Sequence, residues 1–566
     1  MTQGDQRPGG GGRIARAAGQ VAVLTALGRI VGFARWLVFA ATVGAAGVGT
    51  VYQSVNTVPN VVYEIAAGGV LAAVVVPLLA GRVRGVAAAG SEDADDVAGA
   101  LLTRTLTLLL PLAVLLALTA PWISQALLGD LGSPAVELGT RLLVLFSPQV
   151  PLYGLGIVVT GVLQAHERFV AAAAAPLLSS LVVIATYLLY GLLVPPSTPP
   201  ADLSTSGWMI LGGGTTLGVV ALSLPLLIAA GRAGIRLRPR WRLPAELTSR
   251  AARLAGAGIV GLLGQQIAVL VTLKVANRSG GDGTVVVHQY VQALYLLPYA
   301  VLAVPVATAA YPVIARVRER PEPAVRAVAG SLRTVVLLSA AAAAALIVVA
   351  DPVGTVFAAI DRGDGDVALR AMPAGLAATA PGLVGFALAA VATRTLYARG
   401  SALAGGAAVA LGWLVAATGP VLLLGPQDGP GSTLQVIGWS ATLGMTLTAV
   451  LLTVLVRRGW GPGRGQGAPA TAETASADGP REHRGPGVLA GLVPAAALAV
   501  VAVALAQALR VALIDRWPET TGAALVAGAA VAVLVAAAVA LVAAAIDPAV
   551  RAALTRVVPV RTRGPR

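Results

Sequence analysis

The chain has 566 residues and a formal net charge of +15, and 57% of its residues are hydrophobic against 11% charged. Soluble globular proteins carry about 25% charged residues, so this composition excludes a soluble enzyme and a disordered chain. Cysteine is absent, which excludes disulfides and cysteine-held metal clusters, and the three histidines are too scattered for a metal site. The only lysine, Lys274, does not lie in a Gly-Lys-Ser/Thr motif, so the sequence contains no P-loop.

Apolar runs along the whole chain predict an all-α polytopic membrane protein, because a helix crosses the bilayer with about 20 apolar residues. Fourteen runs are long enough to be transmembrane helices, namely 17–44, 50–80, 98–119, 138–163, 170–195, 208–231, 251–276, 284–315, 328–350, 371–397, 401–424, 433–456, 488–509 and 521–546. The predicted architecture is therefore two six-helix lobes plus two C-terminal helices.

The arginines in the loops predict the orientation in the membrane. With the N-terminus in the cytoplasm, 27 arginines fall in cytoplasmic segments and 5 in segments on the opposite side. Cytoplasmic loops of membrane proteins are the ones rich in Arg and Lys, so both termini are predicted to be cytoplasmic. This bias also explains the positive net charge, predicts attraction to anionic membrane lipids, and argues against a nucleic-acid partner.

The spans and loops divide the chain into seven predicted parts. They are a cytoplasmic tail (1–16), an N-lobe (17–231), a basic cytoplasmic loop (232–250), a C-lobe (251–456), a cytoplasmic linker (457–487), two further helices (488–546) and a basic cytoplasmic tail (547–566). Segment 457–487 is rich in Gly, Pro, Ala and charge, which is typical of a flexible linker.

The fourth and tenth spans share residues at a constant offset of 233, which indicates an internal repeat. The shared pairs are Pro148/Pro381, Val158/Val391, Thr160/Thr393, Leu163/Leu396 and Ala165/Ala398. Internal repeats are the usual plan of secondary transporters. Prolines within spans, including Pro59, Pro148, Pro298 and Pro381, are candidate hinges because each removes a backbone hydrogen bond; tolerated kinks are an equal alternative.

Charged residues inside the spans are the candidate binding residues, because a charge at the bilayer centre costs at least about 2.5–3.5 kcal/mol. Arg29 and Arg35 lie in the first span, Glu64 in the second and Lys274 late in the seventh. Guanidinium groups bind phosphate through paired donors, so Arg29 and Arg35 predict a site for an anionic substrate. Two alternatives are a buried salt bridge of either arginine with Glu64 and extension of Lys274 to the lipid headgroups.

Two further motifs have a weaker chemical meaning. Gly28 and Gly32 have the Gly-x-x-x-Gly spacing that permits close helix contact or a bend in the first span. Asp364-Gly-Asp366 follows Asp361 in an outer loop and formally matches the Asp-x-Asp motif of sugar transferases. A short Gly-rich loop without a nucleotide-binding domain is a poor setting for that chemistry, so we predict no catalytic residue, metal or cofactor.

Several stretches resemble the MurJ/MviN family of lipid II flippases. They are Gly28–Arg35 (GRIVGFAR), Val58-Pro-Asn60, Gly68-Gly69, Val76-Pro77, Ser147-Pro-Gln149, Tyr153-Gly154, Gly161–Phe169 (GVLQAHERF), Leu297-Pro298-Tyr299, Tyr311-Pro312 and Arg394-x-x-Tyr397-Ala398. The resemblance covers residues ~20–460, and the motifs occur in the family's order.

The resemblance implies the fold of the multidrug/oligosaccharidyl-lipid/polysaccharide exporter superfamily in a bacterial plasma membrane. It implies movement of undecaprenyl-pyrophosphate-linked peptidoglycan precursor from the inner to the outer leaflet, with Arg29 and Arg35 holding the pyrophosphate in a central cavity. Lys274 and Glu64 are further candidates for this cavity, and Gly28, Gly32, Pro59, Asn60, Pro148, Pro298 and Pro381 are candidate structural or hinge positions.

The sequence also departs from the family pattern. Tyr63-Glu64 stand where the family often has paired arginines, Ala293 replaces an arginine of the eighth span, and Trp36 replaces an acid after the second span-1 arginine. Residues 401–424 contain no Asp or Glu for the family's proposed sodium site. The predicted site is therefore less cationic than is usual in the family.

Three other functions stay open from the sequence alone. One is a related exporter of another lipid-linked glycan or of a small molecule, although a drug–cation antiporter would need more cavity acids than Glu64. Another is a non-transporting scaffold that recruits cell-wall synthesis proteins through its cytoplasmic segments. A membrane glycosyltransferase is the least favoured, because no span contains an acidic catalytic pair.

Overall fold

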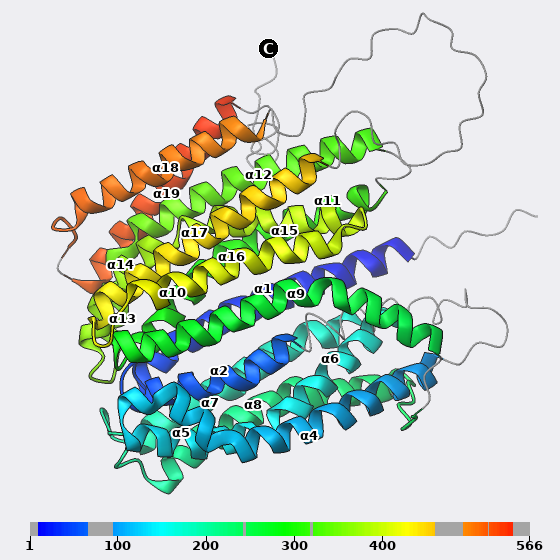
Figure 1. Ribbon diagram of the computed structural model, residues 1–566, viewed down its shortest axis with the longest axis horizontal. Helices are drawn as coiled ribbons and strands as arrows, with labels where there is room; N and C mark the ends of the chain where they lie inside the picture. The colour runs from blue at the N-terminus through cyan, green and yellow to red at the C-terminus, as the bar shows by residue number, and fades with distance from the viewer. Residues whose placement is uncertain are drawn as a thin grey trace, which may run out of the picture. The chain divides into compact units, whose positions relative to one another are not determined.

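The computed structural model describes residues 10–65, 94–241, 245–316, 321–458, 491–518 and 520–546. These ranges are helical and contain no strand (Figure 1). The helices are α1 (Gly10–Thr42), α2 (Val48–Ile65), α4 (Ala94–Leu128), η2 (Gly129–Leu131), α5 (Ser133–Phe146), α6 (Gln149–Ala165), α7 (Phe169–Leu193), α8 (Thr205–Arg232), α9 (Ala245–Val275), η3 (Ala276–Gly280), α10 (Thr284–Pro298), η4 (Tyr299–Ala303), α11 (Val304–Ala315), α12 (Pro321–Val348), α13 (Ala350–Ile360), α14 (Asp366–Thr379), α15 (Gly382–Ala398), α16 (Ala402–Leu423), α17 (Gly429–Arg458), α18 (Leu492–Leu513) and α19 (Thr521–Ile546).

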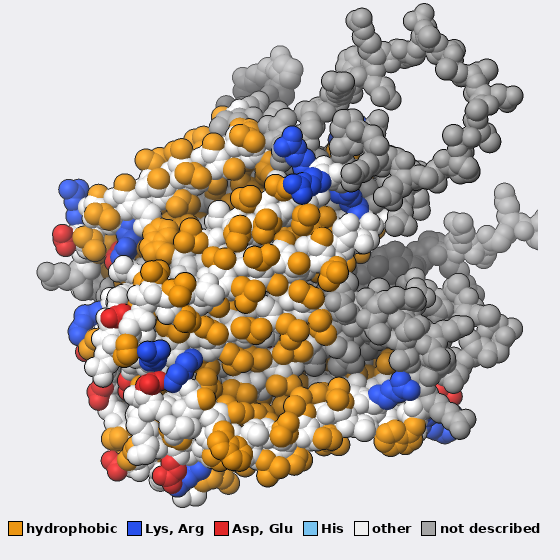
Figure 2. Space-filling view, in the orientation of Figure 1, with side chains coloured by type: hydrophobic (Ala, Val, Ile, Leu, Met, Phe, Trp, Pro, Cys, Tyr) orange, Lys and Arg blue, Asp and Glu red, His pale blue; other side chains and the backbone are white. Residues whose placement is uncertain are grey.

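Twelve helical stretches among the described residues are long and apolar enough to cross a membrane, and the bent pair α14 and α15 makes a thirteenth. The second of the fourteen predicted spans begins as α2 and continues into residues 66–80, outside the described ranges. The predicted all-α membrane fold is confirmed. Figure 2 shows apolar side chains along the middle of the helices and most charged side chains near the helix ends, as a bilayer requires.

Several predicted segments cannot be compared with the structure. Residues 1–9, 459–490 and 547–566 lie outside the described ranges, and so do Gly68, Gly69, Val76 and Pro77. The predicted linker and C-terminal tail therefore stay predictions. By their contacts, the residues form two compact units: 1–293 with 357–371 and 424–434, and 294–356 with 372–423 and 435–566.

The first unit contains the helices that carry the predicted binding residues. In it α7 packs along α1 and α8, while α4 packs against α5 and α6. Its apolar core joins Val97 and Leu101 of α4 to Val158 and Val162 of α6 and to Leu226 of α8. The C-terminal end of α1, which packs along α7, is also buried, since Phe39 and Ala40 are fully buried.

The predicted repeat recurs in the backbone geometry. Pro148 and Pro381 are each the residue immediately before a 17-residue helix, α6 and α15 respectively, so each proline marks a break inside a span rather than a kink in one helix. A helix start tolerates proline because the first N–H groups have no partner within the helix. The pair α14 and α15 is bent by 49° at this break.

The two helices also end alike. Arg168 N donates to Leu163 O at 2.8 Å, and Ser401 N donates to Leu396 O at 2.9 Å, again 233 residues later. The residue in the left-handed conformation is Glu167 (φ 60°) in one turn and Gly400 (φ 80°) in the other. This shared helix ending supports an internal duplication.

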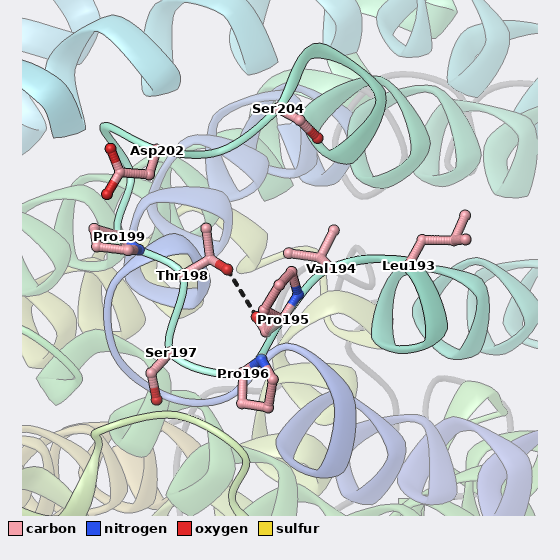
Figure 3. Close-up of a pocket in the computed structure, with 9 residues that line it drawn as sticks. All are labelled: Leu193, Val194, Pro195, Pro196, Ser197, Thr198, Pro199, Asp202 and Ser204. Carbon is pink, nitrogen blue, oxygen red and sulfur yellow. Dashed lines mark hydrogen bonds between the residues drawn. The ribbon is translucent and has the colours of Figure 1, made fainter.

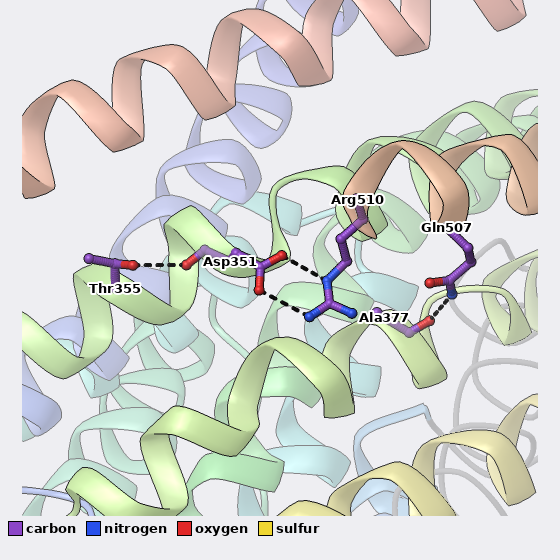
Figure 4. A network of polar contacts seen from close by, with 5 residues as sticks. All are labelled: Asp351, Thr355, Ala377, Gln507 and Arg510. Atoms are coloured by element: carbon purple, nitrogen blue, oxygen red, sulfur yellow. Dashed lines mark hydrogen bonds and ion pairs between the residues drawn. The ribbon is translucent and has the colours of Figure 1, made fainter. Parts of the chain in front are cut away.

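In the second unit, α12 packs against α15, α18 and α19. Small residues allow close helix approach: a Cβ on Gly385 of α15 would lie 2.3 Å from Met445 O of α17. A bidentate ion pair joins α18 to α13, since Arg510 Nε lies 2.8 Å from Asp351 Oδ2 and Nη2 lies 3.0 Å from Oδ1 (Figure 4). Gln507 on the same helix donates to Ala377 O at 2.7 Å.

The predicted hinge Pro298 ends α10, and a five-residue π-helical turn, η4, follows it. A second π-helical turn, η3, ends the α9 segment. The α-helical period of the apolar pattern does not predict either turn. Single π turns are frequent at functional sites and can reorient the side chains that follow them.

Candidate functional site

The two predicted substrate arginines lie on α1 in the first unit. Arg29 is exposed, whereas Arg35, six residues later, is half-buried. The guanidinium carbon of Arg35 lies 5.7 Å from the centre of the Trp36 ring, which is a cation–π contact. Within the described residues, neither arginine forms an ion pair with Glu64, so the alternative of a buried salt bridge is not what the structure has.

Asn60 and Tyr63 of α2 form a polar and aromatic cluster with Tyr153 of α6. Tyr153 donates from its hydroxyl to Asn60 Oδ1 at 2.9 Å, and the rings of Tyr63 and Tyr153 are 4.6 Å apart. Tyrosine hydroxyls and amides are groups with which a sugar-bearing ligand can bond.

The predicted candidates do not all come together. Glu64 is exposed in the last turn of α2. Lys274 instead forms an ion pair with Asp130 of η2, with both side chains more than a third exposed. Pro59 lies inside α2, one residue before Asn60, while a Cβ on Gly28 or Gly32 would have open space around it.

An aromatic layer follows Arg35 along α1. Phe39 stacks on Tyr52 of α2 at 5.7 Å between ring centres and meets Tyr187 of α7 edge-on at 5.2 Å. The Tyr52 hydroxyl lies 3.0 Å from the Tyr187 hydroxyl and 2.8 Å from Thr215 Oγ1. Trp36 meets Tyr290 of α10 edge-on at 5.8 Å. Buried rings with paired hydroxyls form a dense layer between Arg35 and the α1–α2 turn.

Beyond this layer, charged residues from later in the chain bond to the ends of α1, α2 and α7; we call these the capped helix ends. Asp282 accepts from Gly47 N at 2.8 Å and from Thr50 Oγ1 at 2.5 Å. Asp361 accepts from Ala45 N at 2.9 Å. Burial raises the pKa of Asp361 to about 6, although hydrogen bonds from three backbone N–H groups lower this pKa.

Arg362 bonds to two of the capped helix ends. Its backbone N–H donates to Ala40 O at 3.0 Å, near the end of α1. Its guanidinium donates to Gly191 O and, at 3.4 Å, to Val194 O, at the end of α7. In the sequence, the loop 361–366 matches only a metal motif in a poor setting, and no signal in one sequence links it to residues 40–50. Among the described residues, no three His, Asp or Glu side chains gather to hold a metal ion.

The connection between α7 and α8 lies beside the capped helix ends. It forms an open pocket of about 400 Å³, lined by Leu193, Val194, Pro195, Pro196, Ser197, Thr198, Pro199, Asp202 and Ser204 (Figure 3). Thr198 Oγ1 donates to Pro195 O at 2.8 Å across the turn. Ser197 donates to Asp364 at 2.9 Å, so this connection also bonds to the α13–α14 loop.

Comparison with known proteins identifies the family. The sequence model described as "Lipid II flippase MurJ" matches residues 39–479. A probable lipid II flippase MurJ of Rhizobium tropici is 27% identical over 290 residues, 51% of this chain and 52% of the relative. One of Synechocystis is 29% identical over 242 residues, 41% of this chain and 43% of the relative. The chain thus spans about half the length of the curated relatives it matches.

Solved structures show the same fold. A lipid II flippase MurJ in an inward closed conformation is 16% identical and has a TM-score of 0.68, covering 93% of this chain and 98% of that chain. An inward-facing multidrug resistance MATE family transporter of the MOP superfamily is 16% identical with a TM-score of 0.60, covering 77% of this chain and 94% of that chain. Since the family model matches most of the sequence, this chain belongs to the MurJ family of lipid II flippases.

Proposed function

We propose that this chain moves lipid II, the undecaprenyl-pyrophosphate-linked peptidoglycan precursor, from the inner to the outer leaflet of the bacterial plasma membrane. Membership of the MurJ family supports the cargo, and the relatives carry the name of lipid II flippases. In this chain the proposal rests on Arg35. Its guanidinium is half-buried and has no carboxylate partner among the described residues.

The chemistry of the cargo explains the need for such a group. A diphosphate with attached sugars does not cross hydrocarbon unaided, because its polar groups would lose their hydration. A guanidinium replaces that hydration with charge-assisted hydrogen bonds. Arg35 holds the pyrophosphate in this proposal, exposed Arg29 meets it first, and Tyr153 and Asn60 contact the adjoining sugar. Lys274, which pairs with Asp130, and Glu64 stay further candidates for this site.

In this proposal, outward transport of the cargo needs no ATP. With the cell interior negative, outward movement of a diphosphate with two negative charges is favoured by about 2.3 kcal/mol per charge per 100 mV. This amounts to about 4–5 kcal/mol if both charges cross the whole field, and an ion gradient is the other available source. The duplicated six-helix plan supports alternating access, in which one lobe moves against the other.

The arginine distribution supports an orientation with both termini in the cytoplasm and the capped helix ends outside. The cytoplasmic arginines also favour contact with anionic lipids. Cell-wall synthesis enzymes, which supply and consume lipid II, are the expected protein partners.

Rescue of lipid II export tests the proposal. Cells depleted of their own flippase would express this chain, its Arg29→Ala/Arg35→Ala form, or Arg141→Ala as a matched control, and outer-leaflet lipid II would be measured. Arg141 is about half exposed and pairs with Glu137 in its own helix, so its loss should not affect export. The proposal expects rescue by the parent and by Arg141→Ala but not by the double variant. An inserted parent chain that restores no exposure would contradict it.

A further inference from the structure

The capped helix ends are contacts between distant parts of the sequence. Asp282, Asp361 and Arg362 belong to the predicted C-lobe (251–456), whereas the backbone groups they meet belong to residues 40–50 and 191–194. Residues 357–371 and 424–434 likewise belong to one compact unit with residues 1–293 rather than with the helices that flank them in sequence.

The charges match the helix ends that they meet. A helix N-terminus presents free N–H groups and a positive partial charge, and a C-terminus presents free carbonyls and a negative one. The carboxylate of Asp282 lies at the N-terminus of α2, and the guanidinium of Arg362 lies at the C-terminus of α7. Each charged side chain therefore supplies the partner that a remote helix end lacks.

The backbones also approach closely at this end. Gly44, with φ of 88°, lies so near the α13–α14 loop that a Cβ there would be 2.7 Å from Gly363 N and 2.8 Å from its Cα. Only glycine permits both this φ and this contact. A Cβ on Gly365 would lie 2.8 Å from the Cβ of Ala45. The turn and the loop thus fit together in one closed arrangement.

From these contacts we propose that Asp282, Asp361 and Arg362 form a latch that holds the outer end of the transporter closed and must release before cargo leaves outward. The inference rests on the proposed flippase function. The latch is reversible because its partners are backbone groups at helix ends and the Thr50 hydroxyl, all of which water can satisfy once the segments part.

Disulfide crosslinking tests whether the latch must open, and the absence of native cysteine keeps the background clean. The pair Ala45→Cys/Gly365→Cys would join the α1–α2 turn to the α13–α14 loop. A small backbone shift would bring the two Cβ atoms to the disulfide Cβ–Cβ distance of about 3.8 Å. Val183→Cys/Gly218→Cys is the matched control, because it joins α7 to α8, both in the first half. Oxidation of the latch pair should abolish lipid II exposure and reduction should restore it, while the oxidised control pair stays active. Failure of the latch pair to crosslink, or full crosslinking with unchanged exposure, would overturn the latch.

A distance measurement tests the latch without any cargo. Spin labels on Ala201→Cys and Val367→Cys, both exposed, report the separation of the α7–α8 connection from α14 in the purified protein. Asp282→Asn/Asp361→Asn should add a population at longer distance, whereas Asp428→Asn, whose carboxylate bonds within its own loop, should not. Unchanged distances in the double variant would refute the latch. If the double variant adds the longer distance but the parent chain exposes no lipid II in cells, the latch stands and the proposed cargo is refuted.

Discussion

The Arg510–Asp351 pair should be one of the strongest single contacts holding α18 to the second unit. Its side chains are only 14% and 16% exposed, and the two groups meet through two hydrogen bonds of 2.8 and 3.0 Å. Removing one member of a buried pair leaves an uncompensated charge and costs about 3–5 kcal/mol. The residual exposure reduces this, so we expect about 2–3 kcal/mol for Asp351→Asn or Arg510→Gln.

Thermal unfolding in detergent measures the effect. At about 2–4 °C per kcal/mol for a unit of this size, each single variant should melt roughly 5–10 °C lower. Asp351→Leu/Arg510→Met should recover most of the loss, because an apolar pair of similar volume is often neutral. The exposed neighbour Arg516→Gln serves as the control and should change little. Single variants that melt like the parent, or a double variant with the summed loss, would refute the reasoning.

Three further predictions concern other parts of the molecule. Burial raises the pKa of Asp361 to about 6, above about 3.9 in the unfolded chain, so the stability contributed by the protonated carboxyl is complete below about pH 3.9 and is lost as pH rises through about 6. The melting temperature of the parent should therefore fall between pH 5 and 7 more than that of Asp361→Asn. Parallel melting curves for the two proteins would contradict this. Gly385→Ala should destabilise by about 1–3 kcal/mol because its Cβ would meet Met445 O, while Gly431→Ala, with open space around it, should melt like the parent. Tyr153→Phe should cost about 0.5–1.5 kcal/mol through the lost hydrogen bond to Asn60, and an unchanged melting temperature would show that this bond contributes nothing.

The fold was largely predictable because its signals are local. Each apolar run of about 20 residues predicts one span, and the shared prolines predict where the fourth and tenth spans break. The π turns at Ala276–Gly280 and Tyr299–Ala303 were not predictable, since they interrupt the helical period without interrupting the apolar composition. The predicted second span cannot be compared in full, because residues 66–80 lie outside the described residues.

The site was predictable only in part, because pairings between distant residues leave no trace in one sequence. The cost of membrane charge singled out Arg29, Arg35, Glu64 and Lys274, yet it could not show that Lys274 pairs with Asp130, 144 residues away. The contact of Asp361 with Ala45 spans 316 residues. A loop that resembles a metal motif in sequence therefore has a different role in the structure, which is to cap the turn between α1 and α2.

Reconstituted lipid II translocation tests the central claim most directly. Purified parent chain, Arg29→Ala/Arg35→Ala and Arg141→Ala would be placed in vesicles with lipid II in the inner leaflet, under a potassium gradient with valinomycin that makes the interior negative. The account predicts that the parent and Arg141→Ala expose lipid II faster with the potential than without it, and that the double arginine variant exposes none. Equal exposure by the double variant, or none by the parent, would contradict it.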